Sequence, residues 1–271
     1  GRRSFVEALI EDGAVISDFD YALTHSLARA VLYRHPDAEL AARAADRIYE
    51  RVRQSQRSWS DHIYYDFTME LEGYDKLFCA KLVRQAYDEA SYGLVRLPTF
   101  PTTFRFASRD FLDRIGVTEQ ESFAPGDMEL EATFTAVAEW RDYRKTALVR
   151  LQDLVMVKLF EWMEHRGYAF EETVGIKAMS VLGRASSYLP NALKSALSRV
   201  FPKVPRNMRR ETIAAIAMLH KTAQPLLEEV LAMQRTSIAT AGRPLHPREI
   251  YAHLDRKEQR SGGVIGYLRK R

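Results

Sequence analysis

Strand patterns occur in the first half of this chain, and helical patterns fill the second half. Short apolar runs separated by turn residues continue to the turn at residues 124–127, and helical periodicity then extends to about residue 255. This division predicts an α+β domain over residues 1–127, followed by an all-α helical region over residues 128–271. A chain of 271 residues with 46% hydrophobic residues is large enough to bury a substantial core.

The first half opens on a predicted hairpin. Residues 5–10 and 14–16 are apolar runs joined by a short Asp-Gly turn, which is a strong hairpin signal. Further elements are predicted as a helix over residues 18–27, a strand over 28–33, a helix over 36–52, an extended segment over 64–67 and a helix over 108–115.

The only cysteine of the chain lies at the start of a predicted helix over residues 77–91. Apolar residues recur at helical spacing and place Cys79 in the first turn, on the side that faces the core. The positive end of a helix dipole stabilises a thiolate, which is the reactive form of cysteine. The ordinary alternative is a small, buried apolar residue, and a single cysteine excludes an intramolecular disulfide.

Two segments around this cysteine carry a family resemblance. They are Tyr65-Asp66-Phe67 and the helix that runs from Phe78-Cys79 through Leu82-Val83 to Ala86-Tyr87, and upstream Phe5-Val6-Glu7-Ala8 adds a matching strand. Together they resemble the bacterial YiiX/YebB-like branch of the NlpC-like superfamily, a group of circularly permuted, papain-like cysteine hydrolases. The resemblance extends over roughly residues 4–135.

The resemblance implies a permuted papain-like domain in which an antiparallel sheet packs on the nucleophile helix. It makes Cys79 the nucleophile and Glu7 the carboxylate that orients a histidine base, and Tyr65 is a candidate for the substrate pocket. Relatives act on peptidoglycan-type amides, and related permuted members act on lipid acyl groups. Glu7 is also interpretable as an exposed strand carboxylate, and Tyr65 as an aromatic core residue.

The expected histidine stands on a strand just upstream of the strand that carries Glu7. The chain begins at about that point, so the base is expected outside the residues shown; His62 is the internal alternative. The family's Ser-Glu after the nucleophile is Ala80-Lys81 here, and the Lys81 charge is expected to favour a thiolate. The same departures favour a second hypothesis, a catalytically inactive module that binds a membrane or a protein.

Neither a metal nor a cofactor is predicted, because no pair of Cys or His residues stands at ligand spacing and no Gly-rich phosphate loop occurs. No signal peptide is recognised, and the longest apolar runs are far shorter than the ~20 residues of a membrane helix. The compartment is therefore left open.

The second half is expected to be helical over residues 129–166, 173–182, 191–201, 209–241 and 247–254, with a mobile basic tail from residue 256. Residues 174–201 are amphipathic and basic, which fits either packing in a helical bundle or contact with a membrane surface. A basic cluster follows at Lys203, Arg206, Arg209 and Arg210, where a solvated face is the ordinary interpretation. A net charge of +4 does not require an acidic partner, and no motif for specific nucleic-acid recognition is present.

Overall fold

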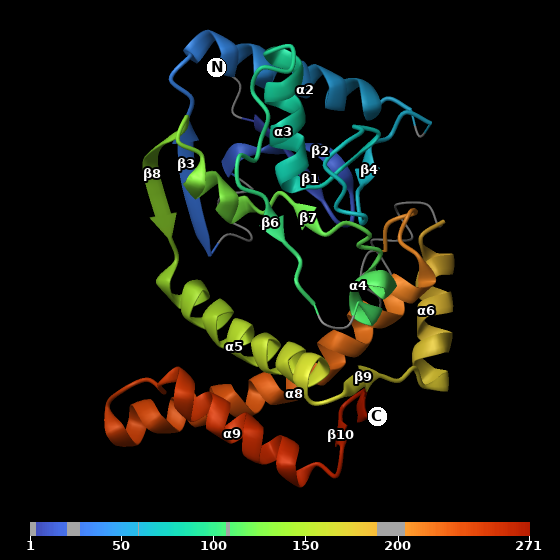
Figure 1. Ribbon diagram of the computed structural model, residues 1–271, viewed down its shortest axis with the longest axis vertical. Coiled ribbons are helices and arrows are strands. Elements are labelled where there is room, and N and C mark those ends of the chain that lie inside the picture. The colour runs from blue at the N-terminus through green and yellow to red at the C-terminus, as the bar shows by residue number, and fades with distance from the viewer. Residues whose placement is uncertain (1–3, 21–27, 59, 107–108, 189–203) are drawn as a thin grey trace. The chain divides into compact units, whose positions relative to one another are not determined.

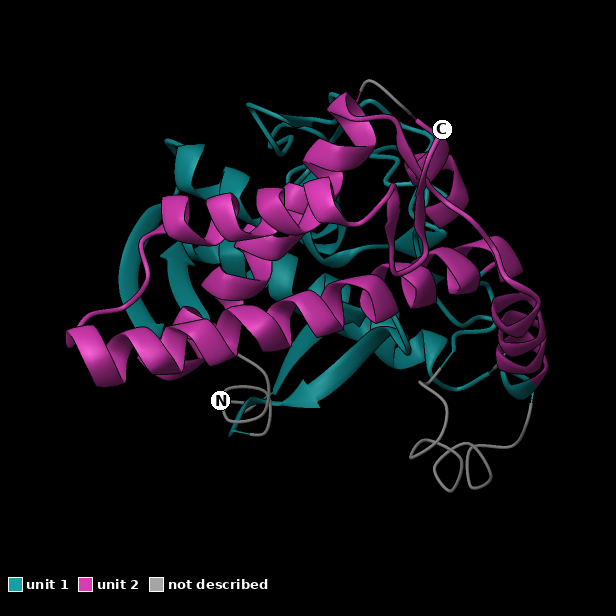
Figure 2. Cartoon of the chain, turned by 90° about the horizontal axis from the view of Figure 1, so that it is seen from below, with its two compact units in different colours: residues 1–105, 116–142, 186–208 teal, residues 106–115, 143–185, 209–271 magenta. Residues whose placement is uncertain are grey.

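The computed structural model describes residues 4–20, 28–58, 60–106, 109–188 and 204–271 (Figure 1). It is a mixed α/β structure with several small sheets. Unit 1 comprises residues 1–105, 116–142 and 186–208, and unit 2 comprises residues 106–115, 143–185 and 209–271 (Figure 2). Both units are therefore assembled from separate stretches of the chain, whereas the sequence predicted a single boundary after residue 127.

Unit 1 contains the strands and helices that surround Cys79. The strands are β1 (Ser4–Leu9), β2 (Gly13–Asp18), β3 (Arg29–Arg34), β4 (Tyr64–Tyr65), β5 (Lys76–Leu77), β6 (Thr102–Thr103), β7 (Glu121–Ser122) and β8 (Thr135–Arg141). The helices are α2 (Ala38–Ser55), α3 (Cys79–Ala90) and the 3₁₀ helix η1 (Pro125–Leu130). The predicted hairpin is confirmed as the antiparallel pair β1–β2. The helix predicted over residues 18–27 falls mostly outside the described residues.

The β1–β2 hairpin packs against α2 and α3. Helix α2 buries Leu40, Ala44, Ile48 and Val52, and this spacing of four residues forms one apolar stripe. The stripe meets Ala8 and Ala14 of the hairpin and Leu82, Ala86 and Ala90 of α3 in one buried cluster. At the N-terminus of α2, the Asp37 side chain accepts a hydrogen bond of 2.9 Å from the Leu40 N–H. An antiparallel hairpin thus covers the helix that begins at Cys79.

Gly13 allows this hairpin to lie close to β4. Its φ of +70° is in the left-handed region, and a Cβ there would stand 2.2 Å from the Ile63 carbonyl oxygen. The neighbouring Ala14 N–H donates to that same oxygen over 2.9 Å. Strand β4 then pairs in parallel with β5, with Tyr65 opposite Leu77. The close approach at Gly13 fixes the two short strands that lead to Cys79.

Unit 2 forms its own apolar core from helices and one small sheet. Its helices are α4 (Asp110–Ile115), α5 (Tyr143–His165), α6 (Val174–Ser186), α8 (Arg210–Ala241) and α9 (Pro247–Arg260), and its strands are β9 (Tyr168–Phe170), β10 (Val264–Ile265) and β11 (Leu268–Lys270). Trp162 and Leu159 of α5, Met218 and Val230 of α8, and Leu254 of α9 are completely buried in this core.

Two expectations for the second half are wrong. Residues 135–141 form strand β8, which pairs antiparallel with β3, where the sequence predicted part of one helix over residues 129–166. The basic tail is ordered: α9 continues to Arg260, and β10 and β11 join β9 in a three-stranded sheet. In both places, pairing with a distant strand decides the conformation. Helix α8 confirms the helix predicted over residues 209–241, whereas the helix predicted over 191–201 lies outside the described residues.

Candidate active site at the start of helix α3

Helix α3 begins at Cys79, which therefore lies in its first turn as the sequence predicted, but the cysteine does not face the core. Its side chain is exposed to solvent, whereas Phe78 before it and Ala80 after it are buried. The buried residues of α3 begin at Ala80, one residue after Cys79. The expectation of a core-facing cysteine is therefore wrong, and an exposed cysteine at a helix start is an arrangement that suits a nucleophile.

The Cys79 thiol has two opposing influences on its pKa. Partial burial raises the pKa, because loss of water costs the charged thiolate more free energy than the neutral thiol. The backbone N–H groups of Ala80 and of Cys79 itself lower it, but by less. The net direction is upward, so at neutral pH the resting group is a thiol and needs a base to become a nucleophile.

Lys81 does not act on Cys79. Its ammonium group donates to Asp66 Oδ2 over 2.9 Å and to the Glu72 carbonyl oxygen over 3.0 Å. Both side chains of the Lys81–Asp66 ion pair are almost fully buried, with 2% and 5% exposed. The expectation that Lys81 favours a thiolate is wrong, because the Lys81 charge is balanced by Asp66, which directly follows β4.

Asp66 also closes the turn that follows β4. Its Oδ1 accepts hydrogen bonds from the Thr68 N–H over 3.0 Å and from the Thr68 hydroxyl over 2.5 Å. With Lys81 on its other oxygen, this carboxylate fastens the loop that leaves β4 to the first turn of α3. The ion pair therefore holds the two segments that carry Tyr65 and Cys79 in fixed positions.

Tyr65 lies beside Cys79, as expected of a residue of the substrate pocket, and its ring is also part of the core. Its ring is buried with Phe78 and Ala80 in one cluster and lies 5.2 Å from the Phe67 ring. Burial raises the pKa of the Tyr65 hydroxyl strongly, and the nearby Cys79 and Asp66 raise it further. Tyr65 therefore keeps its proton and remains a hydrogen-bond donor at the edge of the site.

Glu7 lies on β1 and is held by the hairpin itself. Ser17 on β2 donates a short hydrogen bond to Glu7 Oε1. Val6 and Ala8 on either side of it pack in the cluster that contains α3, so by strand alternation Glu7 projects from the opposite face of β1. Its assignment as the orienting carboxylate stays a prediction.

The described histidines of unit 1 do not supply the base. His62 lies two residues before β4 and Cys79 lies two residues after β5, so along these paired strands the two are offset by about five residues, roughly 16 Å. His35 is buried against the rings of Tyr87 and Phe134, with centroid distances of 5.4 and 5.2 Å. Tyr87 stands two helical turns after Cys79. His25 lies outside the described residues.

Sequence reasoning missed two contacts that define the site. The first is the Asp66–Lys81 pair, which joins residues 15 positions apart through a loop. The second is Asn207, whose side-chain amide donates to the Tyr65 carbonyl oxygen over 2.7 Å from 142 positions away. Lys81 shares its face of α3 with the polar residues Arg84 and Gln85, so the sequence carried no signal of its burial, and nothing in the sequence near Asn207 indicates its partner.

Within the described ranges, no group of His, Cys, Asp and Glu side chains is arranged to hold a metal ion. The helices that the structure describes also lack a segment long and apolar enough to cross a membrane. The comparisons with known proteins gave no family model, curated protein or solved structure that matches this chain.

The raised pKa of Cys79 gives a first prediction. Because Cys79 is the only cysteine, the mass added by iodoacetamide reports on it alone. We expect the alkylation rate of the folded chain to rise with pH through a midpoint above that of an ordinary thiol, since partial burial of the thiol raises its pKa. The urea-unfolded chain is the control and should give a lower midpoint. A folded-state midpoint below neutral pH would contradict this environment.

Proposed function

We propose that this protein is a cysteine hydrolase that cleaves an amide or ester bond through an acyl-enzyme on Cys79. The observation that carries the proposal is the exposed position of Cys79 at the first residue of α3, with the N–H groups of Cys79 and Ala80 directed at its sulfur. An antiparallel hairpin packs on the same helix, which agrees with the permuted papain-like domain that the sequence resembles.

The proposed reaction needs an attacking thiolate and a stabilised oxyanion. A histidine removes the thiol proton, the sulfur bonds to the substrate carbonyl carbon, and the leaving amine or alcohol departs with that proton. Water then attacks the thioester, so the acid is released and the thiol is restored. The Ala80 N–H and the Tyr65 hydroxyl are the groups beside the sulfur that can donate to an oxyanion.

The proposed histidine stands on a strand that pairs with β1. Within the described part of the chain β1 is bonded only to β2, so its other edge can accept a further strand. Glu7 is on β1 and would be adjacent to residues of such a strand. This arrangement agrees with the resemblance, in which the histidine strand comes directly before the strand with Glu7.

The substrate class follows from the resemblance and from α6. Amides of the peptidoglycan type and lipid acyl groups are the two candidates. Val174, Lys177 and Val181 lie on one exposed face of α6, and the two valines are 84% and 54% exposed. This face supports the proposed contact with a membrane surface, while Ile176 and Ser180 on the other face are buried within unit 2.

Labelling by an acyl electrophile tests the proposal. We expect an activated acyl ester to acylate Cys79 faster than it acylates the urea-unfolded chain, and a Cys79→Ala variant to remain unlabelled. Tyr65→Phe keeps the ring but removes the hydroxyl, and we expect it to slow acylation by about 10²-fold with the fold retained. Intact-mass spectrometry over time measures both rates, and an alkyl halide of similar size serves as the control for simple access.

A second candidate is an inactive module with a papain-like fold. The raised pKa of Cys79 and the replacement of Ser-Glu by Ala80-Lys81 favour it. In this case the folded chain should acylate no faster than the unfolded chain, and Tyr65→Phe should have no effect. That result, obtained with the full-length protein, would exclude the proposed hydrolase activity.

A further inference from the structure

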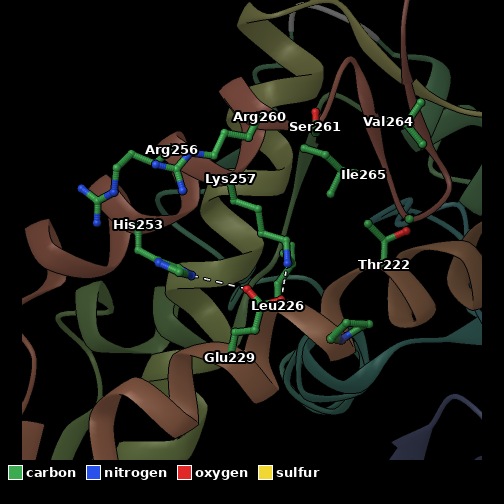
Figure 3. A pocket seen from close by; sticks show the side chains of 12 residues that line it. Thr222, Leu226, Glu229, His253, Arg256, Lys257, Arg260, Ser261, Val264 and Ile265 are labelled. Atoms are coloured by element: carbon green, nitrogen blue, oxygen red, sulfur yellow. Dashed lines mark hydrogen bonds and ion pairs between the residues drawn. The ribbon is translucent and has the colours of Figure 1, made fainter. Parts of the chain in front are cut away.

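A pocket in unit 2 lies between α8, α9 and the β10–β11 hairpin, within one compact unit (Figure 3). Its volume is about 470 Å³, which is in the range of small-molecule sites. Pro225 and Leu226 of α8 and Ile265 of β10 give it an apolar wall. Leu226 and Ile265 are 2% and 5% exposed, so this wall is continuous with the core of the unit.

The opposite wall of the pocket is cationic. His253, Arg256, Lys257 and Arg260 recur at spacings of three, one and three residues and therefore share one face of α9. Glu229 of α8 is the single carboxylate among the lining residues. It accepts a short hydrogen bond from Lys257 and lies 3.4 Å from His253 Nε2 (Figure 3).

Burial raises the pKa of Glu229, but the hydrogen bond and charge of Lys257 lower it by more, so its pKa lies below the ordinary value. The carboxylate is therefore ionised at neutral pH and balances one positive charge. In the described part of the chain, no carboxylate lies within ion-pair distance of Arg256 or Arg260. Two guanidinium groups at the pocket thus have unbalanced charge.

The other face of α9 carries paired charges. There, Asp255 accepts a hydrogen bond from Arg166 over 2.7 Å and forms an ion pair of 2.8 Å with Lys158, and Glu258 accepts from Arg166 over 2.8 Å. The cations that face this side of α9 are thus paired with carboxylates, whereas Arg256 and Arg260 lie beside a cavity with no carboxylate in ion-pair distance among the described residues. Each planar guanidinium group can donate two parallel hydrogen bonds to two oxygens of a phosphate.

We propose that this pocket binds a phosphate monoester carried on a small apolar group. Arg256 and Arg260 bind the phosphate oxygens, Lys257 adds a positive charge, and the apolar wall at Leu226 and Ile265 contacts the organic part. The ligand has two possible sources with the same chemistry: a soluble phosphorylated molecule, or the phosphomonoester headgroup of a lipid such as phosphatidic acid. The proposal is independent of Cys79.

Calorimetric titration of the full chain with phenyl phosphate tests the site. We expect saturable binding that weakens as salt is raised, because the attraction is ionic. Arg256→Gln combined with Arg260→Gln should weaken binding at least tenfold. The matched control combines Arg235→Gln with Arg248→Gln, which removes the same charge from exposed positions of α8 and α9 outside the pocket, and should bind as the original chain does.

Co-sedimentation with vesicles distinguishes the two sources. Vesicles of phosphatidylcholine with phosphatidic acid are compared with vesicles of phosphatidylcholine alone. Retention on phosphatidic acid that the pocket variant loses and the control keeps identifies a lipid headgroup, and binding of phenyl phosphate alone identifies a soluble ligand. Absence of saturable binding of phenyl phosphate, or an equal loss in both double variants, would overturn the proposal.

Discussion

Lys81→Met is expected to lower the free energy of unfolding by about 3–5 kcal/mol, because it leaves the Asp66 carboxylate buried without its counter-ion. The side chains of Lys81 and Asp66 are 2% and 5% exposed, so water cannot replace the lost partner. The two hydrogen bonds from Thr68 remain but supply no positive charge. Urea denaturation followed by circular dichroism measures the change.

Two further variants separate this burial effect from a general loss of charge. Lys76→Met removes an exposed lysine on β5 and should change the free energy of unfolding by less than about 0.5 kcal/mol. Adding Asp66→Asn to Lys81→Met should restore most of the stability, since no buried charge is then left unpaired. A loss below about 1 kcal/mol for Lys81→Met would show that the pair is not buried in solution.

The second large effect is expected in the core of unit 2. Trp162 on α5 is completely buried among side chains of α8, α9 and β9, including Tyr168 at a ring distance of 6.4 Å. Trp162→Ala should lower the free energy of unfolding by about 3–5 kcal/mol, the usual cost of removing a buried aromatic ring. The indole N–H has no hydrogen-bond partner in the structure, so this cost is one of packing.

Leu148→Ala on the same helix is the matched control for Trp162→Ala. Leu148 is 40% exposed, so its truncation should cost well under half as much. Heat denaturation followed at the far-ultraviolet helix signal measures both variants. Equal losses for the two would show that α5 is held by its own helical propensity and not by the packing of unit 2.

Local patterns determined the elements around the candidate site. The turn at Glu11-Asp12-Gly13 predicted the β1–β2 hairpin, and the apolar spacing from Leu82 to Ala90 predicted a helix with Cys79 in its first turn. Both signals act over a few residues, because turns and helical turns are closed by neighbours in the chain. The same kind of signal found α8 over nearly its whole length, despite Pro225.

Strand β8 and the ordered tail could not be found in this way. Arg141 of β8 pairs with Arg29 of β3, more than a hundred positions earlier, and Lys270 of β11 pairs with Tyr168 of β9. A strand forms its backbone hydrogen bonds with another segment, so its own sequence does not show whether a partner strand is present.

For the candidate site, the sequence by itself determined that a single cysteine stands at the start of an amphipathic helix behind a strand hairpin. Only the tertiary structure decided that Cys79 is exposed, that Tyr65 lies beside it, and that Lys81 pairs with Asp66 instead of the thiol. The physical reason is that periodicity along one helix defines which residues share a face, whereas exposure and charge pairing depend on what other segments bring to that face.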